Sequence, residues 1–300
     1  MPSSTLASAT TEAPAPPAER ASGFWADTLH RVVRNRAAVT GGIVVAIFVV
    51  VAALAPIVSP YDPLKGGLSN RLRAPSTTHW LGTDELGRDV LSRVLYGARI
   101  TAQIQVAAVG LALVLGTALG LAAGYVRGSV DQTIMRLMDI LMAFPGIFLA
   151  LAIIAALGTG LSNVIIATGI FLVPQFARVV RASILTLREM EFVQAARALG
   201  RGDVAIVFRY LLPNSLAPII VQTSLRMATV LLTASGLSFL GLGVQPPSPE
   251  WGAMLSNARS YMITAPHVAL MPGLAIAVVV LGFNLLGDGL RDSLDPRLRE

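Results

Sequence analysis

Few residues in this sequence could carry out chemistry, and those few are scattered. The three histidines, His30, His79 and His267, are far apart along the chain and lie at or outside the edges of long apolar runs. There is no cysteine, which excludes a disulfide, a thiolate metal site and a cysteine nucleophile. No Ser-His-Asp arrangement or metal-ligand spacing stands out. The sequence therefore predicts no catalytic residue, no metal site and no cofactor in this chain.

An energy source is also missing from the sequence. The single lysine, Lys65, stands between Leu64 and Gly66 and does not fit the G-x-x-x-x-G-K-[ST] pattern of a P-loop. Charges within apolar runs are scarce: Asp139 and Arg226 lie inside runs, and Arg136, Arg178 and Arg181 lie near the ends of runs. Because an ion-driven transporter needs a relay of buried acids and histidines, a self-powered secondary transporter is disfavoured. Any ATP would have to bind another subunit.

The composition is that of an integral membrane protein. Of 300 residues, 54% are apolar and 13% are charged, and the mean hydropathy is +0.68, whereas soluble domains carry about 25% charged residues. The arginines are concentrated in loops on one side, as the positive-inside rule expects, so the net charge of +6 does not indicate nucleic-acid binding. Each of the following apolar runs is near the ~20 residues that cross a bilayer: 37–58, 101–126, 134–157, 161–182, 214–240 and 266–287.

These runs predict an all-α integral membrane fold with six transmembrane helices and both termini in the cytoplasm. Residues 1–36 are expected to be a cytoplasmic, largely disordered tail, because their start is rich in Ser, Thr, Ala and Pro. Residues 37–58 form the first anchor helix, and 59–100 an external loop with an amphipathic helix at the membrane surface or on the bundle. Residues 101–290 form the core with five transmembrane helices and a polar loop at 183–213, and 291–300 form a cytoplasmic tail.

Glycine and proline mark two features of the core. Gly116, Gly120 and Gly124 form a small-residue seam that allows close helix packing, within the chain or at a subunit interface. Phe144-Pro145-Gly146 and Pro174 interrupt apolar runs, so each is expected to kink its helix or to loosen its hydrogen-bond ladder.

The polar loop has a helical pattern of its own. Phe192, Ala195, Ala196 and Leu199 recur at the spacing of one helix face. Gly200 follows where a left-handed C-cap is expected. A second short helical segment is predicted from Asp203 to about Leu212, where Pro213 closes it. The shallow alanine face suits docking into a groove on another protein, and packing against the chain's own bundle is the alternative.

Several motifs resemble those of a known family. Gln194-Ala195-Ala196, Gly200 and Leu212-Pro213 look like the EAA loop of binding-protein-dependent ABC importer permeases, although Gln194 and Tyr210 stand where that pattern usually has Glu and Ile. Nearly all of the chain after residue 35 resembles the C-type subunit of dipeptide, oligopeptide and nickel importers. The resemblance rests on HWLGTD at 79–84, GRD at 87–89, DILMAFP at 139–145, RVVR at 178–181, LSFLGLG at 237–243, WG at 251–252 and FNLLGDGLRDSLDP at 283–296.

The resemblance implies a type I ABC importer permease fold in the bacterial plasma (inner) membrane. It implies a non-catalytic subunit that forms a pathway with a paralogous B-type permease. Two ABC ATPase subunits would bind ATP and Mg. One would dock on the 190–213 loop of this chain and the other on the coupling loop of the B-type permease. An extracytoplasmic solute-binding protein would deliver the substrate. Dipeptides or oligopeptides are the expected substrates. Nickel chelates, another small solute and a non-transporting scaffold remain alternatives.

The resemblance also assigns candidate residues to each role. The ATPase-coupling interface is expected at Phe192, Gln194, Ala195, Ala196, Arg197, Leu199, Gly200, Arg201, Leu212 and Pro213. The translocation pathway is expected to include Asp139, Phe144, Pro145 and Arg226, and contacts with the binding protein are expected at Asp84, Arg88 and Trp251.

Overall fold

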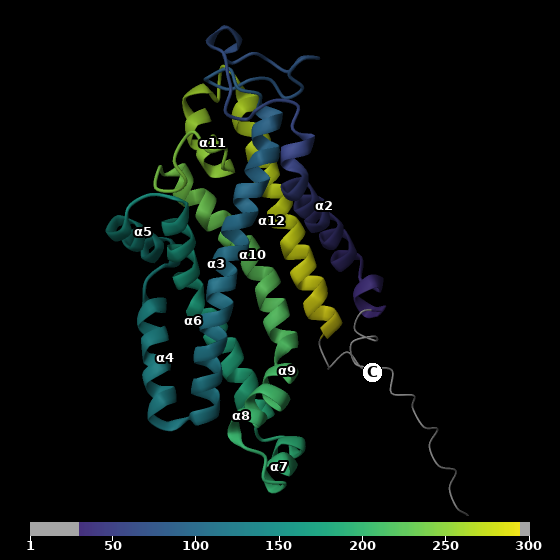
Figure 1. Ribbon diagram of the computed structural model, residues 1–300, viewed down its shortest axis with the longest axis vertical. Coiled ribbons are helices and arrows are strands. Elements are labelled where there is room, and N and C mark those ends of the chain that lie inside the picture. Colours follow the sequence, from purple (N-terminus) through teal and green to yellow (C-terminus); the bar gives the residue numbers. More distant parts are fainter. Residues whose placement is uncertain (1–29, 295–300) are drawn as a thin grey trace, which may run out of the picture.

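The computed structural model describes residues 30–294, which form an elongated bundle of helices (Figure 1). The predictions for residues 1–29 and for the end of the C-terminal tail, 295–300, lie outside the described residues. Within the described part, five helices are long and apolar enough to cross a membrane. They are α2 (Arg36–Val58), α3 (Val90–Val126), α6 (Leu161–Leu187), α10 (Leu216–Phe239) and α12 (Pro266–Leu294).

The sixth predicted span is broken in two. Helices α4 (Gly128–Ala143) and α5 (Gly146–Leu157) together have the length and hydropathy of a span, but they are bent by 92° at the break. Phe144 has an extended backbone, with φ −88° and ψ 133°, because the ring of Pro145 disfavours the helical region for the residue before it. The predicted kink at this position is confirmed and is a sharp corner. In contrast, α6 continues as one helix through Pro174.

Helix α3 is longer than predicted, since it runs without a break for 37 residues. The amphipathic helix predicted before residue 100 is present, but the predicted break between it and the span at 101–126 is wrong, because the two form one helix. Asp89 begins the helix by accepting a hydrogen bond from the Ser92 N–H at 2.8 Å, and no proline occurs between Val90 and Val126 to stop it. The polar first turns and the apolar remainder belong to the same rod.

The small-residue seam of α3 packs against α6 within the chain. A Cβ added at Gly116 would lie 2.4 Å from the Phe176 Cβ, and one added at Gly120 would lie 2.6 Å from the Ala177 carbonyl oxygen. At Gly124 the neighbour is the Cβ of Ile184, at 2.9 Å. Only glycine permits this approach, so the seam brings the two backbones together over three helical turns.

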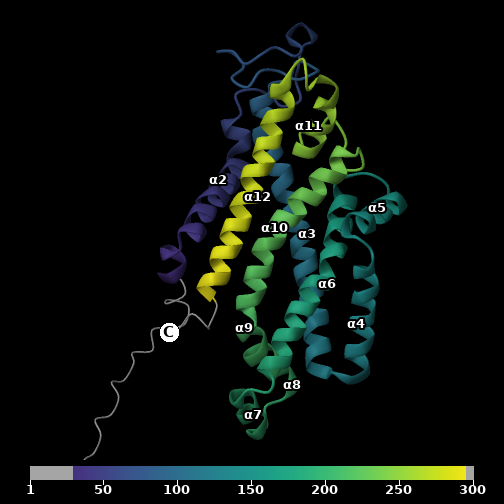
Figure 2. The same ribbon diagram turned by 180° about the vertical axis from the view of Figure 1, so that it is seen from behind.

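Helix α2 lies along α12 in both views (Figures 1 and 2). Its Phe48 ring packs 5.8 Å from the ring of Trp251 and 6.3 Å from that of Phe283, measured between centroids. Near its start, Gly41 fits against the Leu286 backbone nitrogen, which an added Cβ would approach to 2.3 Å. The anchor helix is thus part of the bundle.

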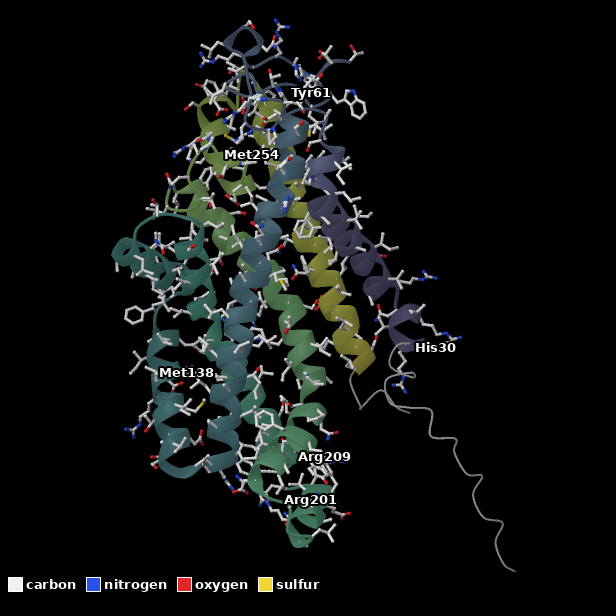
Figure 3. All side chains as sticks on the ribbon, in the orientation of Figure 1. His30, Tyr61, Met138, Arg201, Arg209 and Met254 are labelled. Carbon is white, nitrogen blue, oxygen red and sulfur yellow. The ribbon has the colours of Figure 1, made fainter. Side chains whose placement is uncertain are left out.

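The loops gather at two opposite ends of the bundle (Figures 1 and 3). One end carries α7 (Glu191–Ala198), α8 (Asp203–Ala205), a π-helical stretch at Ile206–Leu211 and α9 (Leu212–Asn214). The other end, called the cap below, comprises residues 59–89 and 240–265. The cap includes α11 (Trp251–Ala258) and two 3-10 turns, Leu68–Asn70 and Arg259–Tyr261.

Replacing Gly116 by alanine tests the seam. The new methyl group would meet the Cβ of Phe176 and the carbonyl oxygen of Val173 at 2.4 and 2.9 Å, so we expect G116A to destabilise the protein by about 1–3 kcal/mol. The matched control is G110A on the same helix, where nothing lies within 4 Å of an added Cβ and alanine is the better helix former. Thermal unfolding of the purified protein in detergent measures both, and equal melting temperatures for the two variants would contradict the packing described.

Candidate coupling site and translocation face

Helix α7 presents one face to the bundle and another to its surroundings. Val193 and Ala196 are buried, whereas Phe192, Ala195 and Leu199 are exposed. The predicted grouping of Ala196 with the docking face is wrong, because Val193 is the larger buried side chain and Ala196 lies one turn from it on the same side. Gln194 points outward with the exposed set.

The turn after α7 has the left-handed conformation predicted for it. Gly200 has φ +75°. Its N–H donates to the Arg197 carbonyl oxygen at 2.9 Å, and the Arg201 N–H donates to the Ala196 carbonyl oxygen at 3.1 Å. This pair of bonds is the Schellman motif, which ends a helix by satisfying its last carbonyls. No atom lies within 4 Å of a Cβ added at Gly200, so only the backbone conformation favours glycine here.

The second helical segment does not end at Pro213 as predicted. It continues from α8 through the π-helical stretch into α9, and Pro213 lies in the first turn of α9. A proline is tolerated there because the first turn of a helix needs no N–H donor. Leu212 is half-buried and Pro213 is exposed, so the two side chains lie at the edge of the segment.

Polar contacts fix this loop to the ends of α3 and α6. The Tyr125 hydroxyl donates to the Asp203 carboxylate, and the guanidinium of Arg197 lies 5.7 Å from the centre of the Tyr125 ring. Arg188 donates to the carbonyl oxygen of Tyr125 at 2.9 Å and to that of Gly124 at 3.3 Å. Arg197 is thus held by its own chain, whereas Arg201 extends at the far end of the loop (Figure 3).

The loop exposes large apolar side chains beyond those predicted. Leu199, Val204 and Phe208 are 82%, 73% and 62% exposed, and they lie at the end of the molecule remote from the cap. We call these three the apolar knob. Exposed apolar clusters of this kind mark protein contacts. Val204 and Phe208 are not among the predicted contacts, although their i, i+4 spacing in the predicted helical segment places them on one helix face.

In the cap, the structure contradicts two of the predicted contacts with a binding protein. Asp84 and Arg88 are only 2% and 3% exposed. The Asp84 carboxylate accepts from the Arg88 Nε at 2.7 Å and the Arg88 N–H at 2.9 Å, and it pairs with Arg93 at 3.2 Å. Both residues fold the cap, since a buried carboxylate needs this set of partners.

Trp251, the third predicted contact, is also buried, and its indole N–H donates to the Val94 carbonyl oxygen at 2.9 Å. Next to it, Glu250 caps α11 by accepting from the Gly252 N–H at 2.9 Å and the Ala253 N–H at 2.8 Å. Burial raises the pKa of Glu250 above its ordinary value, although these backbone donors oppose the shift. The cap instead exposes Trp80, Met262 and Ile263.

The four predicted pathway residues lie in two places. Asp139, Phe144 and Pro145 belong to the α4–α5 arm and are exposed, whereas Arg226 belongs to α10 (Figures 1 and 2). Asp139 already forms an ion pair with Arg178 of α6 at 2.5 Å. One turn along α6, Arg181 binds Asp131 through two hydrogen bonds of 2.5 and 2.6 Å. The two pairs attach α4 to α6.

Arg226 is half-buried on α10, and its guanidinium lies within hydrogen-bond distance of the Gln222 amide. Beside it, towards the coupling loop, is a groove of about 770 Å³. Its lining residues come from α6, the start of α7, α9, α10 and α12: Val179, Leu187, Met190, Phe192, Pro213, Asn214, Ala217, Pro218, Val221, Gln222, Leu225, Arg291 and Leu294.

The comparisons with known proteins agree with this architecture. The family described as binding-protein-dependent transport system inner membrane component matches residues 116–300. The N-terminal transmembrane domain of oligopeptide transport permease C matches residues 23–75.

Two similar proteins illustrate the relatives. The glutathione transport system permease protein GsiD of Pectobacterium atrosepticum is 48% identical over 276 residues, which is 92% of each chain. The dipeptide transport system permease protein DppC of Alkalihalophilus pseudofirmus is 48% identical over 275 residues, or 92% of this chain and 90% of the relative.

Two solved structures share the fold. A chain of the MetNI methionine ABC transporter in inward-facing conformations superposes with a TM-score of 0.54 at 19% identity, over 68% of this chain and 96% of that one. A chain of an amino acid ABC transporter with histidines gives 0.52 at 15% identity, over 67% and 94%. At these identities the likeness concerns the fold alone.

The buried carboxyl of the cap leads to a prediction about pH. Because the pKa of Glu250 is raised in the folded protein, the folded state holds its proton more tightly than the unfolded chain does. That stabilisation is complete below the ordinary carboxyl pKa and is lost as the pH rises through the raised value. We therefore expect the melting temperature to fall over this window in the wild type and to change less in E250Q.

The control is D62N, which neutralises a partly exposed carboxylate of the same cap and should keep the wild-type slope. The measurement is thermal unfolding between pH 4 and pH 8, a window of about four pH units around the carboxyl range. An unchanged slope in E250Q would show that Glu250 does not titrate differently in the two states.

Proposed function

Since the chain belongs to the family of binding-protein-dependent transport system inner membrane components and is a permease subunit of the peptide branch of ABC importers, we propose that it carries small peptides across the inner membrane. Dipeptides and glutathione are the favoured substrate class, because relatives with these two names match over 92% of the chain. Neither of these two names favours nickel chelates or a scaffold without transport.

The observation that carries the proposal is the exposed end of the coupling loop. The apolar knob and Ala195 are exposed on the loop at the end of the bundle opposite the cap, whereas Phe192 lines the groove beside α10. Such a surface is stable in water only when a partner covers it. The proposed partner is an ABC ATPase subunit, which receives α7 and the knob in a groove, as short amphipathic helices are commonly bound.

The other proposed contacts complete the transporter. A second ATPase subunit docks on the equivalent loop of a paralogous B-type permease, and both ATPases bind ATP and Mg. Gln194 and Arg201 are exposed polar groups at the rim of the docking surface, where they set its orientation. ATP binding and hydrolysis then shift the permease pair between inward-open and outward-open states through different contacts in each.

The cap is the proposed docking surface for the extracytoplasmic solute-binding protein. Its exposed apolar side chains, Trp80, Met262 and Ile263, replace the buried Asp84, Arg88 and Trp251 as candidate contacts. Aromatic and methionine side chains are enriched in protein interfaces. Arg226, together with Phe144 and Pro145 at the bend of the α4–α5 arm, is proposed to line the pathway.

Replacing Gly200 by valine tests the coupling role. A β-branched residue at φ +75° is strained by about 1–3 kcal/mol, which would unwind the turn between α7 and α8. We expect G200V to reduce both peptide uptake and ATP hydrolysis stimulated by the loaded binding protein by about tenfold, since ~1.4 kcal/mol corresponds to one factor of ten. Both are measured in proteoliposomes that contain the complete transporter.

The matched control is G200N at the same position. Asparagine adopts the left-handed conformation far more readily than valine, and there is room for its side chain, so G200N should retain most of the activity. Equal amounts of the three proteins in the membrane exclude a defect of insertion. Normal uptake by G200V would refute the assignment of this loop to coupling.

A further inference from the structure

We propose that Arg226, positioned by Gln222, binds the carboxylate of the peptide as it passes through the pathway. This proposal rests on the proposed function, because it presumes that the open side of α10 lines the route of the substrate. It names the chemical group that the pathway recognises, and the residue that recognises it.

The first step is the incomplete set of partners around Arg226. With the Gln222 amide turned so that both side chains are satisfied, its oxygen accepts from the Arg226 Nε at 2.8 Å and from one terminal nitrogen at 3.2 Å. The other terminal nitrogen makes no hydrogen bond to a described residue, and no described carboxylate lies within ion-pair distance. By contrast, Arg178 and Arg181 of α6 both have carboxylate partners on α4.

The second step is the position of this charge in the membrane. Arg226 is the eleventh residue of the 24-residue helix α10, so it lies near the middle of a span. Ionised side chains at this depth are unfavourable unless they are paired or face a water-filled cavity, and where they occur they usually serve a function. A guanidinium satisfied only by a neutral amide is suited to receive an anion.

The third step is the groove beside it. Gln222 belongs to the groove lining, together with Val221 and Leu225 of α10, Val179 of α6 and Arg291 of α12. None of the described residues that line the groove is an aspartate or a glutamate. The groove therefore has largely apolar walls, with the cation of Arg291 in its lining and that of Arg226 next to the lining residue Gln222. This arrangement favours a small anion with an apolar body.

The fourth step is the match to the substrate. A guanidinium presents its N–H groups in a fork that fits the two oxygens of a carboxylate. Every unmodified peptide ends in such a carboxylate, whatever its side chains are. A contact with this group thus serves many sequences, whereas the apolar walls accept variable side chains without specific bonds.

The transport experiment compares R226Q, R226K and R136Q in the complete transporter, reconstituted with its binding protein and ATPases. Arg136 is an exposed arginine of α4 with no ion pair to a described residue, so R136Q controls for the loss of one charge. We expect R226Q to lower dipeptide uptake by about tenfold, R226K to lie between R226Q and the wild type, and R136Q to match the wild type. ATP hydrolysis stimulated by the loaded binding protein should persist in all four.

A second experiment detects the charge directly. The chain has no cysteine, so V221C places a single thiol in the groove, in a transporter whose other subunits are also cysteine-free. An anionic thiosulfonate reagent should modify this thiol faster than a cationic one of similar size, and the dipeptide should slow the reaction. Adding R226Q should remove or reverse the preference for the anion.

The outcomes separate this inference from the proposed function. Absence of uptake and of stimulated ATP hydrolysis in the wild type would refute the function itself. Wild-type uptake by R226Q, or an unchanged charge preference at V221C, would refute only the role of Arg226. If R226Q instead releases the paired permease during purification, Arg226 forms an ion pair across that interface, and the inference is wrong.

Discussion

The close approach of α3 and α6 is the contact on which the rest of the molecule depends. In a bilayer, helices gain little from burying apolar side chains against one another, because lipid is equally apolar, so tight van der Waals packing must hold them together. Gly116, Gly120 and Gly124 allow this packing by leaving no side chain between the two backbones. Where the seam ends, Arg188 binds the last carbonyls of α3, and α6 leads directly into the coupling loop. The position of that loop follows from the seam.

Charge is used in two ways within the spans. On α6, Arg178 and Arg181 are neutralised by Asp139 and Asp131, and the pairs attach the broken α4–α5 arm to the bundle. On α10, Arg226 has only an amide for a partner among the described residues. The same residue type therefore attaches helices where the chain supplies a carboxylate and, in our proposal, binds a ligand where the described residues supply none. This difference is visible only when the partners are known.

The sequence predicts the features that local rules determine. Apolar runs locate the spans because the bilayer fixes their length, Phe144-Pro145 locates the break because proline restricts its neighbour, and Gly200 locates the turn because few residues adopt its conformation. Features that depend on distant residues were not predictable.

The cap residues and α7 show why those features escape. Asp84 and Trp251 have side chains typical of exposed contacts. Asp84 is buried with the nearby Arg88 and Arg93, and Trp251 is buried because segments more than 150 residues apart meet, as its bond to Val94 shows. In α7, periodicity shows which residues share a face, but the choice of Val193 and Ala196 as the inward side depends on the helices beneath it.

Helix α3 joins the two working ends of the protein with a single piece of backbone. Its 37 residues extend for about 55 Å at 1.5 Å per residue. At one tip Asp89 and Arg93 anchor it in the cap, and at the other Tyr125 holds the coupling loop through Asp203. A tilt of α3 would therefore move the cap and the coupling loop together, because no break in the helix lies between them.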